Sequence, residues 1–134
     1  MAKVHLRKVT LDNFQECISL EVKENQKEFL ATNVKSLAQA YVNPNLFPFA
    51  IYDGAVMGYI QPQLPMIGFV MYEIVGGIGF ILRLMIDSKY QQQGYGKATV
   101  LEVVRRLKLY PEVEVIATSY KKGNEAASKF YRSL

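Results

Sequence analysis

Apolar and polar positions follow two different periods along this chain, and each period predicts one kind of element. Alternation, or a continuous apolar run bounded by turn residues, predicts a strand. Apolar residues at every third or fourth position after a capping residue predict a helix. The predicted strands cover residues 3–8, 47–54, 66–75, 77–87 and 112–119. The predicted helices cover residues 10–26, 33–41, 96–110 and 124–134.

Caps and turns set the limits of these elements. Thr10, Thr32 and Asn124 are the expected N-caps, because a side-chain oxygen there can accept from a free N–H of the first helical turn. Pro111 follows the third helix, where the chain cannot continue as a helix. Gly76-Gly77 is expected to join the two longest strands as a hairpin.

A second hairpin is expected at Asp53-Gly54, pairing residues 47–54 with residues 55–60, "AVMGYI". The order is then strand, two helices, hairpins, and a final strand, helix, strand and helix. This order predicts an α/β fold in which one sheet carries both antiparallel and parallel pairs.

Composition limits the class of protein. The chain has 134 residues, of which 50% are hydrophobic and 21% are charged, as expected for one soluble domain over residues 1–134. Its apolar runs are broken before the ~18 residues that a membrane span needs, and the N-terminus does not resemble a signal peptide. Cys17 is the only cysteine, which excludes a disulfide within the chain and predicts a cytoplasmic location.

The net charge and the histidine content limit the kinds of ligand that the chain is expected to bind. The formal charge is +4 and the isoelectric point is about 9.1, which suits an anionic ligand. No block of lysine and arginine marks a nucleic-acid partner. His5 is the single histidine and has no metal-ligating neighbour in the sequence, so no metal site is expected.

Residues 90–99, "YQQQGYGKAT", carry the most specific chemistry. They join a long strand to a helix that begins near Gly96, so several backbone N–H groups and the positive end of the helix meet at one point. Gly94 and Gly96 allow a close approach to the backbone, and Lys97 adds a charge. This arrangement predicts a phosphate site.

Two other phosphate-binding patterns fit poorly. A P-loop requires GxxxxGK followed by Ser or Thr, and "QQQGYGKA" has neither the spacing nor the hydroxyl. A dinucleotide fingerprint requires glycine or alanine where this chain has Thr99, and a second nucleotide-binding half would not fit in the remaining length.

A third pattern fits better and extends over nearly the whole chain. Gln91-x-x-Gly94-x-Gly96 after "RLMID", together with "NEAASKFY" at residues 124–131, resembles the two motifs of the GCN5-related N-acetyltransferase (GNAT) superfamily, which binds acetyl-coenzyme A. Residues 22–44, "VKENQKEFLATNVKSLAQAYVNP", are similar to the bacterial spermine and spermidine acetyltransferases of that superfamily.

The resemblance implies a GNAT fold, with a mixed central β-sheet and about four flanking helices. Two departures from the family pattern stand out. Residues 55–67 are several residues longer than the usual turn, and the chain ends at Leu134 without the family's final strand. An exposed sheet edge invites pairing with another chain, so a homodimer is one expected state.

The resemblance also implies roles for particular residues. Leu84, Met85 and Ile86 would pair through their backbone with the pantetheine arm of coenzyme A, and Tyr131 would be the general acid that protonates its sulfur. The remaining implied cofactor-binding residues are Gln91, Gln92, Gln93, Gly94, Tyr95, Gly96, Lys97, Ala98, Asn124 and Ala127, with Tyr131 again among them. For Asn124 and Tyr131, a helix cap and a packed core tyrosine are the competing interpretations.

No general base is evident in the sequence. Glu24, Glu28 and Glu73 are candidates for binding or deprotonating the amine, although a solvated surface position is the preferred interpretation of each. Together with Glu21 they could attract a polycation.

The predicted function is acetyl-coenzyme A-dependent acetyl transfer, directly to a primary amine of a small molecule, with a polyamine such as spermidine or spermine as the expected acceptor. The alternative is a non-catalytic or strand-swapped GNAT-fold module that binds acetyl-coenzyme A. A nucleotide-dependent oxidoreductase is a third, weaker hypothesis. These hypotheses differ in whether coenzyme A binds and whether thiol is released.

Overall fold

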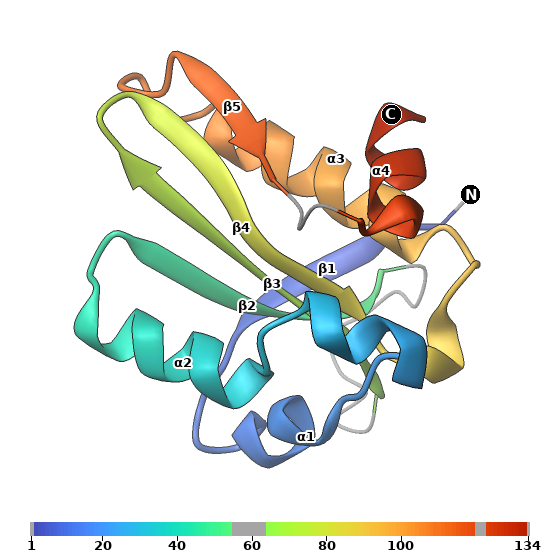
Figure 1. Cartoon of the computed structure of the whole chain (residues 1–134). Coiled ribbons are helices and arrows are strands. Elements are labelled where there is room, and N and C mark those ends of the chain that lie inside the picture. The colour runs from blue at the N-terminus through green and yellow to red at the C-terminus, as the bar shows by residue number, and fades with distance from the viewer. Residues whose placement is uncertain (1, 55–63, 120–122, 134) are drawn as a thin grey trace.

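One five-stranded sheet forms the centre of the molecule. The structure is a computed structural model that describes residues 2–54, 64–119 and 123–133. The strands are β1 (Val4–Lys8), β2 (Leu46–Asp53), β3 (Met66–Val75), β4 (Ile78–Ile86) and β5 (Val115–Thr118). They lie in the order β1-β2-β3-β4-β5, with every pair antiparallel except the parallel pair β4-β5 (Figure 1). The α/β class and the mixed sheet are therefore as predicted.

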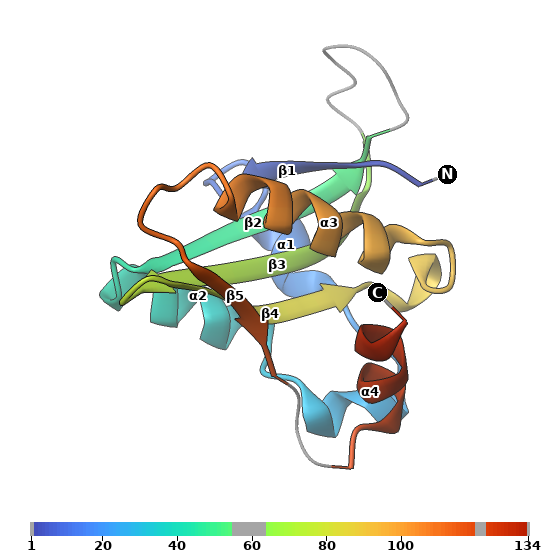
Figure 2. The ribbon, with the colours of Figure 1, turned by 90° about the horizontal axis from the view of Figure 1, so that it is seen from above.

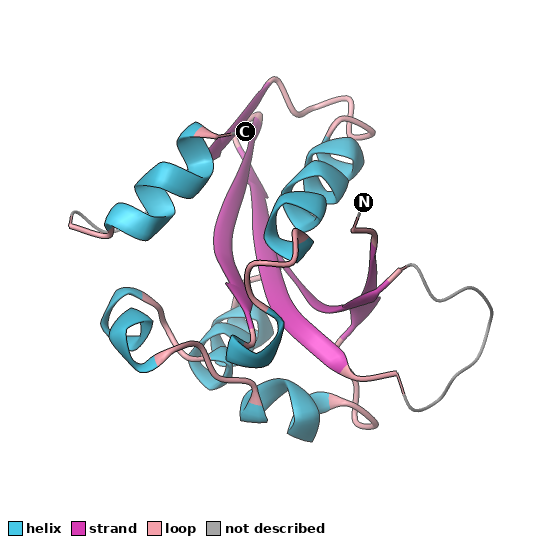
Figure 3. Cartoon of the chain, turned by 90° about the vertical axis from the view of Figure 1, so that its right-hand side faces the viewer, coloured by secondary structure: helices cyan, strands magenta, loops and turns pink. Residues whose placement is uncertain are grey.

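Helices cover both faces of this sheet. They are α1 (Phe14–Ser19), α2 (Asn33–Val42), α3 (Tyr95–Leu107) and α4 (Glu125–Arg132), with short 3₁₀ turns η1 (Glu24–Phe29) and η2 (Ser88–Tyr90). Figures 2 and 3 show α3 and α4 on one side of the sheet and α1, α2 and η1 on the other. Each side has its own apolar core, and both cores rest on β3.

The hairpin β3-β4 follows the sequence prediction. Residues Met66 to Tyr72 are buried without interruption, as expected for a central strand covered on both faces. Gly76 and Gly77 turn the chain with φ of 59° and 81°, values that a two-residue hairpin turn needs and that glycine adopts readily.

A bulge interrupts β4 where the two cores meet. Arg83 pairs with Met71, but the next pair along the ladder is Ile81 with Tyr72, so Leu82 is an extra residue. Pairing between β4 and β5 ends at Ile81 and Thr118. Beyond that point the edge of β4 that faced β5 has no strand partner among the described residues.

The first predicted helix is wrong in both length and cap. Residues 10–26 do not form one helix, because α1 covers only Phe14–Ser19 and the next helical turn, η1, begins at Glu24. Asn13, not Thr10, is the N-cap of α1, and the Thr10 amide donates to the Asn13 side chain. Contacts with the far end of β4 hold the intervening residues extended, and a local pattern cannot show such contacts.

The other helix predictions are confirmed to within three residues at each described end. Thr32 caps α2 by accepting from the Lys35 amide, and the Asn124 side chain caps α4 by accepting from the Ala127 amide. Between α1 and α2 the chain forms the short 3₁₀ helix η1. The hairpin expected at residues 55–60 lies outside the described residues.

Candidate functional site

A phosphate-sized binding point lies where α3 begins. Gly94 is the N-cap of this helix and has φ of 88°, so the backbone turns there in a left-handed conformation. The N–H groups of the first helical turn have no intrahelical acceptor, and the positive end of the helix dipole is centred on them. Gln92 also has a positive φ, 60°, which is uncommon for a residue with a side chain. Such local strain is typical of ligand-binding loops.

An open groove starts at this point and runs along the unpaired part of β4. The loop before α3, Leu84 to Ile86 on β4, the first half of η1 and the inner face of α4 form its walls. Of the fourteen residues predicted to bind the cofactor, twelve line the groove, and Gln93 and Ala98 do not. The structure therefore brings together segments that are about 40 residues apart in sequence.

The groove also contains residues that the sequence did not single out. Val22, Gln26 and Leu30 come from η1 and its flanks, and Phe130 comes from α4. Phe130 could have been found, because it lies inside the "NEAASKFY" motif. The η1 residues could not, because only the folded chain brings them opposite β4.

Gly96 sets the distance between α3 and α4. A Cβ atom at this position would lie 3.3 Å from the ring of Phe130 and 4.0 Å from the Ile86 side chain. The absence of a side chain lets α4 approach the start of α3 and close one side of the groove.

The glutamine that opens the motif has a structural role. Gln91 donates to the Ile86 carbonyl at 2.9 Å and exchanges two hydrogen bonds with Gln26, at 2.8 and 3.2 Å. Its side chain thus ties the loop before α3 both to β4 and to η1. Of the other two glutamines, Gln92 lines the groove and Gln93 lies outside it.

A buried carboxylate strengthens the same connection. Asp87 is 4% exposed, its two oxygens accept from the amides of Glu21 and Lys89, and its own amide donates to the Ile67 carbonyl. Ser88 returns a hydrogen bond from its amide to the Glu21 carbonyl. These bonds fasten the segment before η1 to the end of β4, which is why the first predicted helix breaks there.

A second cavity adjoins the groove. Its volume is about 630 Å³, within the roughly 300–1,000 Å³ usual for small-molecule sites. The two spaces share a wall made by Leu30, Leu84, Asn124, Ala127 and Tyr131. The second cavity extends from this wall toward the start of α2 and the bulge of β4.

Tyr131 stands at the junction of the two spaces. Its ring packs edge-on against Phe130, with 5.0 Å between centroids. Burial raises the pKa of the Tyr131 phenol, and a hydrogen bond with Thr118 opposes that shift. A tyrosine hydroxyl already keeps its proton at neutral pH, and the upward shift preserves this state while making the phenol a weaker acid.

The acidic candidates lie elsewhere. Glu24 is exposed on η1 and pairs with Lys27 at 3.0 Å, and Glu28 is exposed on the same turn. Glu73 is on β3 opposite Phe80, beyond the bulge. None of the three lines the groove or the second cavity. The geometry therefore does not assemble an acidic site from them.

Searches for other kinds of site were negative within the described ranges. Residues 2–54, 64–119 and 123–133 contain no group of three or more side chains arranged to hold a metal ion. No helix in the same ranges is long and apolar enough to cross a membrane.

A mixed sheet that opens beside a glycine-rich helix start, with a groove along the opening, defines an acyl-coenzyme A-dependent class of transferase. A family model agrees with this class: the acetyltransferase (GNAT) family model matches residues 11–134, so the chain belongs to this family. It is an N-acetyltransferase by family, and the family takes its acetyl group from acetyl-coenzyme A.

Solved structures show the same fold at low sequence identity. NAA60 of Arabidopsis thaliana, in complex with a bisubstrate analogue, is 15% identical with a TM-score of 0.69, over 98% of this chain and 83% of that one. The PaiA N-acetyltransferase of Thermoplasma acidophilum, in complex with coenzyme A, is 16% identical with a TM-score of 0.61, over 98% and 88%. An aminoglycoside acetyltransferase from an uncultured soil metagenomic sample is 19% identical with a TM-score of 0.61, over 98% and 86%. No curated protein matches the chain.

Proposed function

We propose that this chain transfers an acetyl group directly from acetyl-coenzyme A to an amine of a small molecule. The observation that carries the proposal is the junction of two spaces at Leu84 and Tyr131. One space begins at a phosphate-binding helix start and follows the free edge of β4, as a coenzyme A molecule would require. The other has the size of a small acceptor.

Each part of the groove has a distinct task in this proposal. The backbone from Gln91 to Ala98 holds the pyrophosphate with N–H groups. The free edge of β4 at Leu84 to Ile86 pairs with the amides of the pantetheine arm and supplies an N–H donor to the oxyanion. Asn124 and Ala127 line the opposite side, at the start of α4.

Tyr131 is the proposed general acid. Attack of a neutral amine on the thioester produces a tetrahedral oxyanion, and its collapse releases a thiolate. Proton donation to that sulfur by a positioned hydroxyl speeds the release. Tyr131 is placed at the junction of the two spaces and keeps its proton near neutral pH, which supports this role.

Direct transfer is favoured over an acyl-enzyme because the cysteine is out of reach. Cys17 is fully buried in the core between α1 and the sheet and lines neither space. Burial, with the nearby Glu16 carboxylate, raises the pKa of its thiol to about 11. A thiol that stays protonated inside a core is a poor nucleophile.

A polyamine acceptor is the narrower prediction made from the sequence. Its support is the resemblance of residues 22–44 to polyamine acetyltransferases and the exposed carboxylates of Glu21, Glu24 and Glu28 beside the groove. A cationic acceptor needs carboxylates within the site as well, and no described carboxylate lines either space. Three expectations from the sequence stay predictions: that the chain acts as one domain, that it forms a homodimer, and that it is located in the cytoplasm.

Thiol release tests the proposal. The protein is mixed with acetyl-coenzyme A and a panel of polyamines, aminoglycosides, amino acids and peptides, and free thiol is followed with a thiol-reactive dye. We expect release that depends on one class of amine, together with thermal stabilisation by coenzyme A. At a hundred times Kd, this stabilisation is roughly 2.7 kcal/mol.

The competing hypotheses predict other results. Stabilisation by coenzyme A with no thiol release for any amine would support the non-catalytic module. Stabilisation by a nicotinamide dinucleotide and not by coenzyme A would support an oxidoreductase.

A further inference from the structure

Arg83 is a charged residue in an otherwise apolar strand, and the bulge of β4 determines where it lies. Because Leu82 is an extra residue, Arg83 is opposite Met71, whose side chain belongs to the core beneath α2. Arg83 thus shares its face of β4 with Met85, whose side chain is part of this core. The guanidinium donates to Gln39 of α2 at 3.0 Å and to the Leu82 carbonyl at 3.1 Å.

Within the described residues, the partners of this guanidinium are neutral. No carboxylate among the described residues forms an ion pair with Arg83. Its Nε is fully buried and has no hydrogen-bond partner. Arg83 is partly buried, its partners among the described residues are neutral, and one buried N–H is unused, so an anionic ligand would gain a charged donor here.

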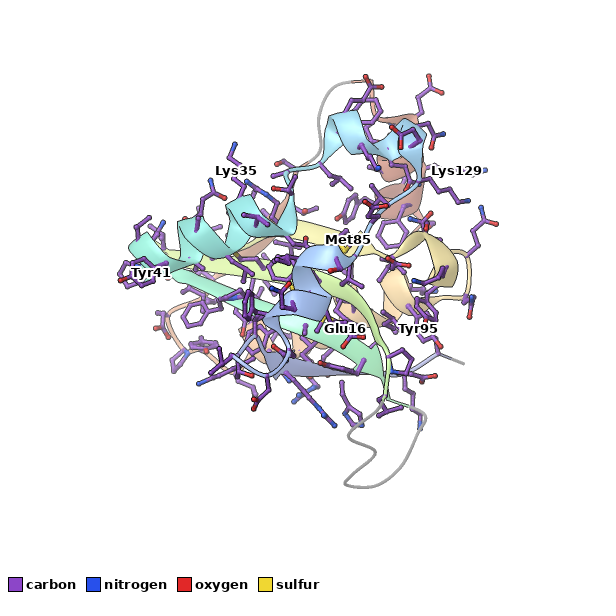
Figure 4. All side chains as sticks on the ribbon, turned by 90° about the horizontal axis from the view of Figure 1, so that it is seen from below. Glu16, Lys35, Tyr41, Met85, Tyr95 and Lys129 are labelled. Carbon is purple, nitrogen blue, oxygen red and sulfur yellow. The ribbon has the colours of Figure 1, made fainter. Side chains whose placement is uncertain are left out.

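The second cavity, which Arg83 lines, contains further positive charge. Lys35 lines the same cavity and projects from the first turns of α2 (Figure 4). The cavity also receives the N-terminal end of α2 at Thr32, which adds positive potential. No carboxylate lines it. Arg83 and Lys35 thus form a cationic pair within a space that opens onto Tyr131.

We infer that the acceptor is an amine that also carries a carboxylate, which Arg83 and Lys35 bind while the amine reaches the junction at Tyr131. This inference rests on the proposed acetyl transfer and names its acceptor class. It opposes a polyamine, because two cations in the acceptor cavity would repel one. A planar guanidinium suits a carboxylate, to which it can donate two parallel hydrogen bonds.

Matched pairs of acceptors test the inference. We would compare ω-amino acids of increasing length with their own carboxamides, and with spermidine, measuring KM and kcat by thiol release. At the preferred length, the carboxylate form should have a KM about 10-fold lower or more, because a charge-assisted hydrogen bond contributes roughly 1.5–3 kcal/mol. Equal KM values for acid and amide, or a preference for spermidine, would overturn the inference.

Variants then assign the effect to the two cations. Arg83→Met should remove the preference for the carboxylate, Arg83→Lys should keep part of it, and Lys35→Met should weaken it. The KM for acetyl-coenzyme A should stay unchanged in all three. Lys108→Met is the matched control, because Lys108 is an exposed lysine beyond α3 that lines neither space.

Two further measurements keep a failed variant or an inactive protein from hiding the answer. Because Arg83→Met also loses the contact with Gln39, its fold is checked by circular dichroism, and Lys35→Met tests the same cavity from the surface. Calorimetric titration of the coenzyme A-saturated protein measures the preference without catalysis. Absence of thiol release refutes the proposed function, whereas equal binding of acid and amide refutes this inference alone.

Discussion

Tyr131 is the residue whose chemistry is most open to test. The residue lines both the groove and the second cavity, and burial raises the pKa of its hydroxyl. We expect Tyr131→Phe to lower kcat by ~100-fold, the lower range for a general acid, because the ring and its packing stay in place. The affinity for coenzyme A, measured by calorimetry, should change little.

Tyr41→Phe provides the control for this substitution. Tyr41 is 91% exposed on α2, away from both spaces (Figure 4), so losing its hydroxyl should leave kcat unaltered. If Tyr131→Phe also turns over at the original rate, the tyrosine is a packing residue and another group protonates the sulfur.

At the scale of single residues, motifs predicted the site where its parts are local. Gly94, Gly96 and Tyr131 were identified from two short patterns, and each lies in the groove. Arg83 was not, because one arginine in an apolar strand has no pattern to mark it, and its position depends on a one-residue bulge. The role of Gln91 was also missed, since its partner Gln26 is 65 residues away.

At the scale of elements, two glycine turns can be compared: the turn into α3 at Gly94 faces the groove, whereas the turn between β3 and β4 at Gly76 does not. Gly94 and Gly76 both have a left-handed φ, 88° and 59°, and an added Cβ meets no hard clash at either. We expect Gly94→Ala and Gly76→Ala each to cost about 1 kcal/mol of stability, through backbone strain.

Only one of the two substitutions should affect the cofactor. Gly94 lies in the groove and Gly76 lies at the far end of β3. Loss of one charge-assisted hydrogen bond predicts ~10-fold weaker binding of coenzyme A by Gly94→Ala, and unchanged binding by Gly76→Ala. Equal affinities in a titration of both variants would show that the pyrophosphate is held elsewhere.

Elements with a continuous periodic pattern were predicted well, and those held by distant contacts were not. β3 and β4 are long apolar runs with a glycine turn, so local sequence suffices for the hairpin. Residues 20–23 carry a helical pattern, yet the Glu21 amide donates to the Asp87 carboxylate and the Glu21 carbonyl accepts from the Ser88 amide, so this segment is not helical. Tertiary bonds outweigh a weak local preference of this kind.

At the scale of the whole molecule, stability should depend on an acid-sensitive cluster on α3. Hydrogen bonds from Arg105, and also from Arg106, lower the pKa of the Glu102 carboxyl to about 2, against an ordinary value of 4.5. The folded state therefore favours the ionised form. The ionised Glu102 carboxylate makes its full contribution to the free energy of unfolding above pH 4.5. This contribution is lost as the pH falls toward 2.

Urea unfolding at a series of acidic pH values measures this contribution. Because the arginines are partly solvated, we expect Glu102→Gln to remove about 1 kcal/mol at neutral pH and to flatten the decline between pH 4.5 and 2. If the free energy of unfolding of Glu102→Gln falls with pH as steeply as that of the original protein, then other carboxylates cause the loss of stability in acid.

The order of elements was enough to predict one mixed sheet with antiparallel and parallel pairs, but not the order of its strands. The opening between β4 and β5 was not predicted. It depends on where a parallel pair stops and on the extra residue Leu82, neither of which has a signature in one sequence.

The hydrogen bonds that join Asp87 to Glu21 and Gln91 to Gln26 have a consequence for how the two substrates bind. They connect the loop proposed to hold the cofactor to the segment that borders both spaces. A ligand that orders one side of this connection spares the other ligand part of the entropic cost of ordering it. Acetyl-coenzyme A and the acceptor should therefore bind cooperatively, and by thermodynamic linkage each raises the affinity of the other by the same factor.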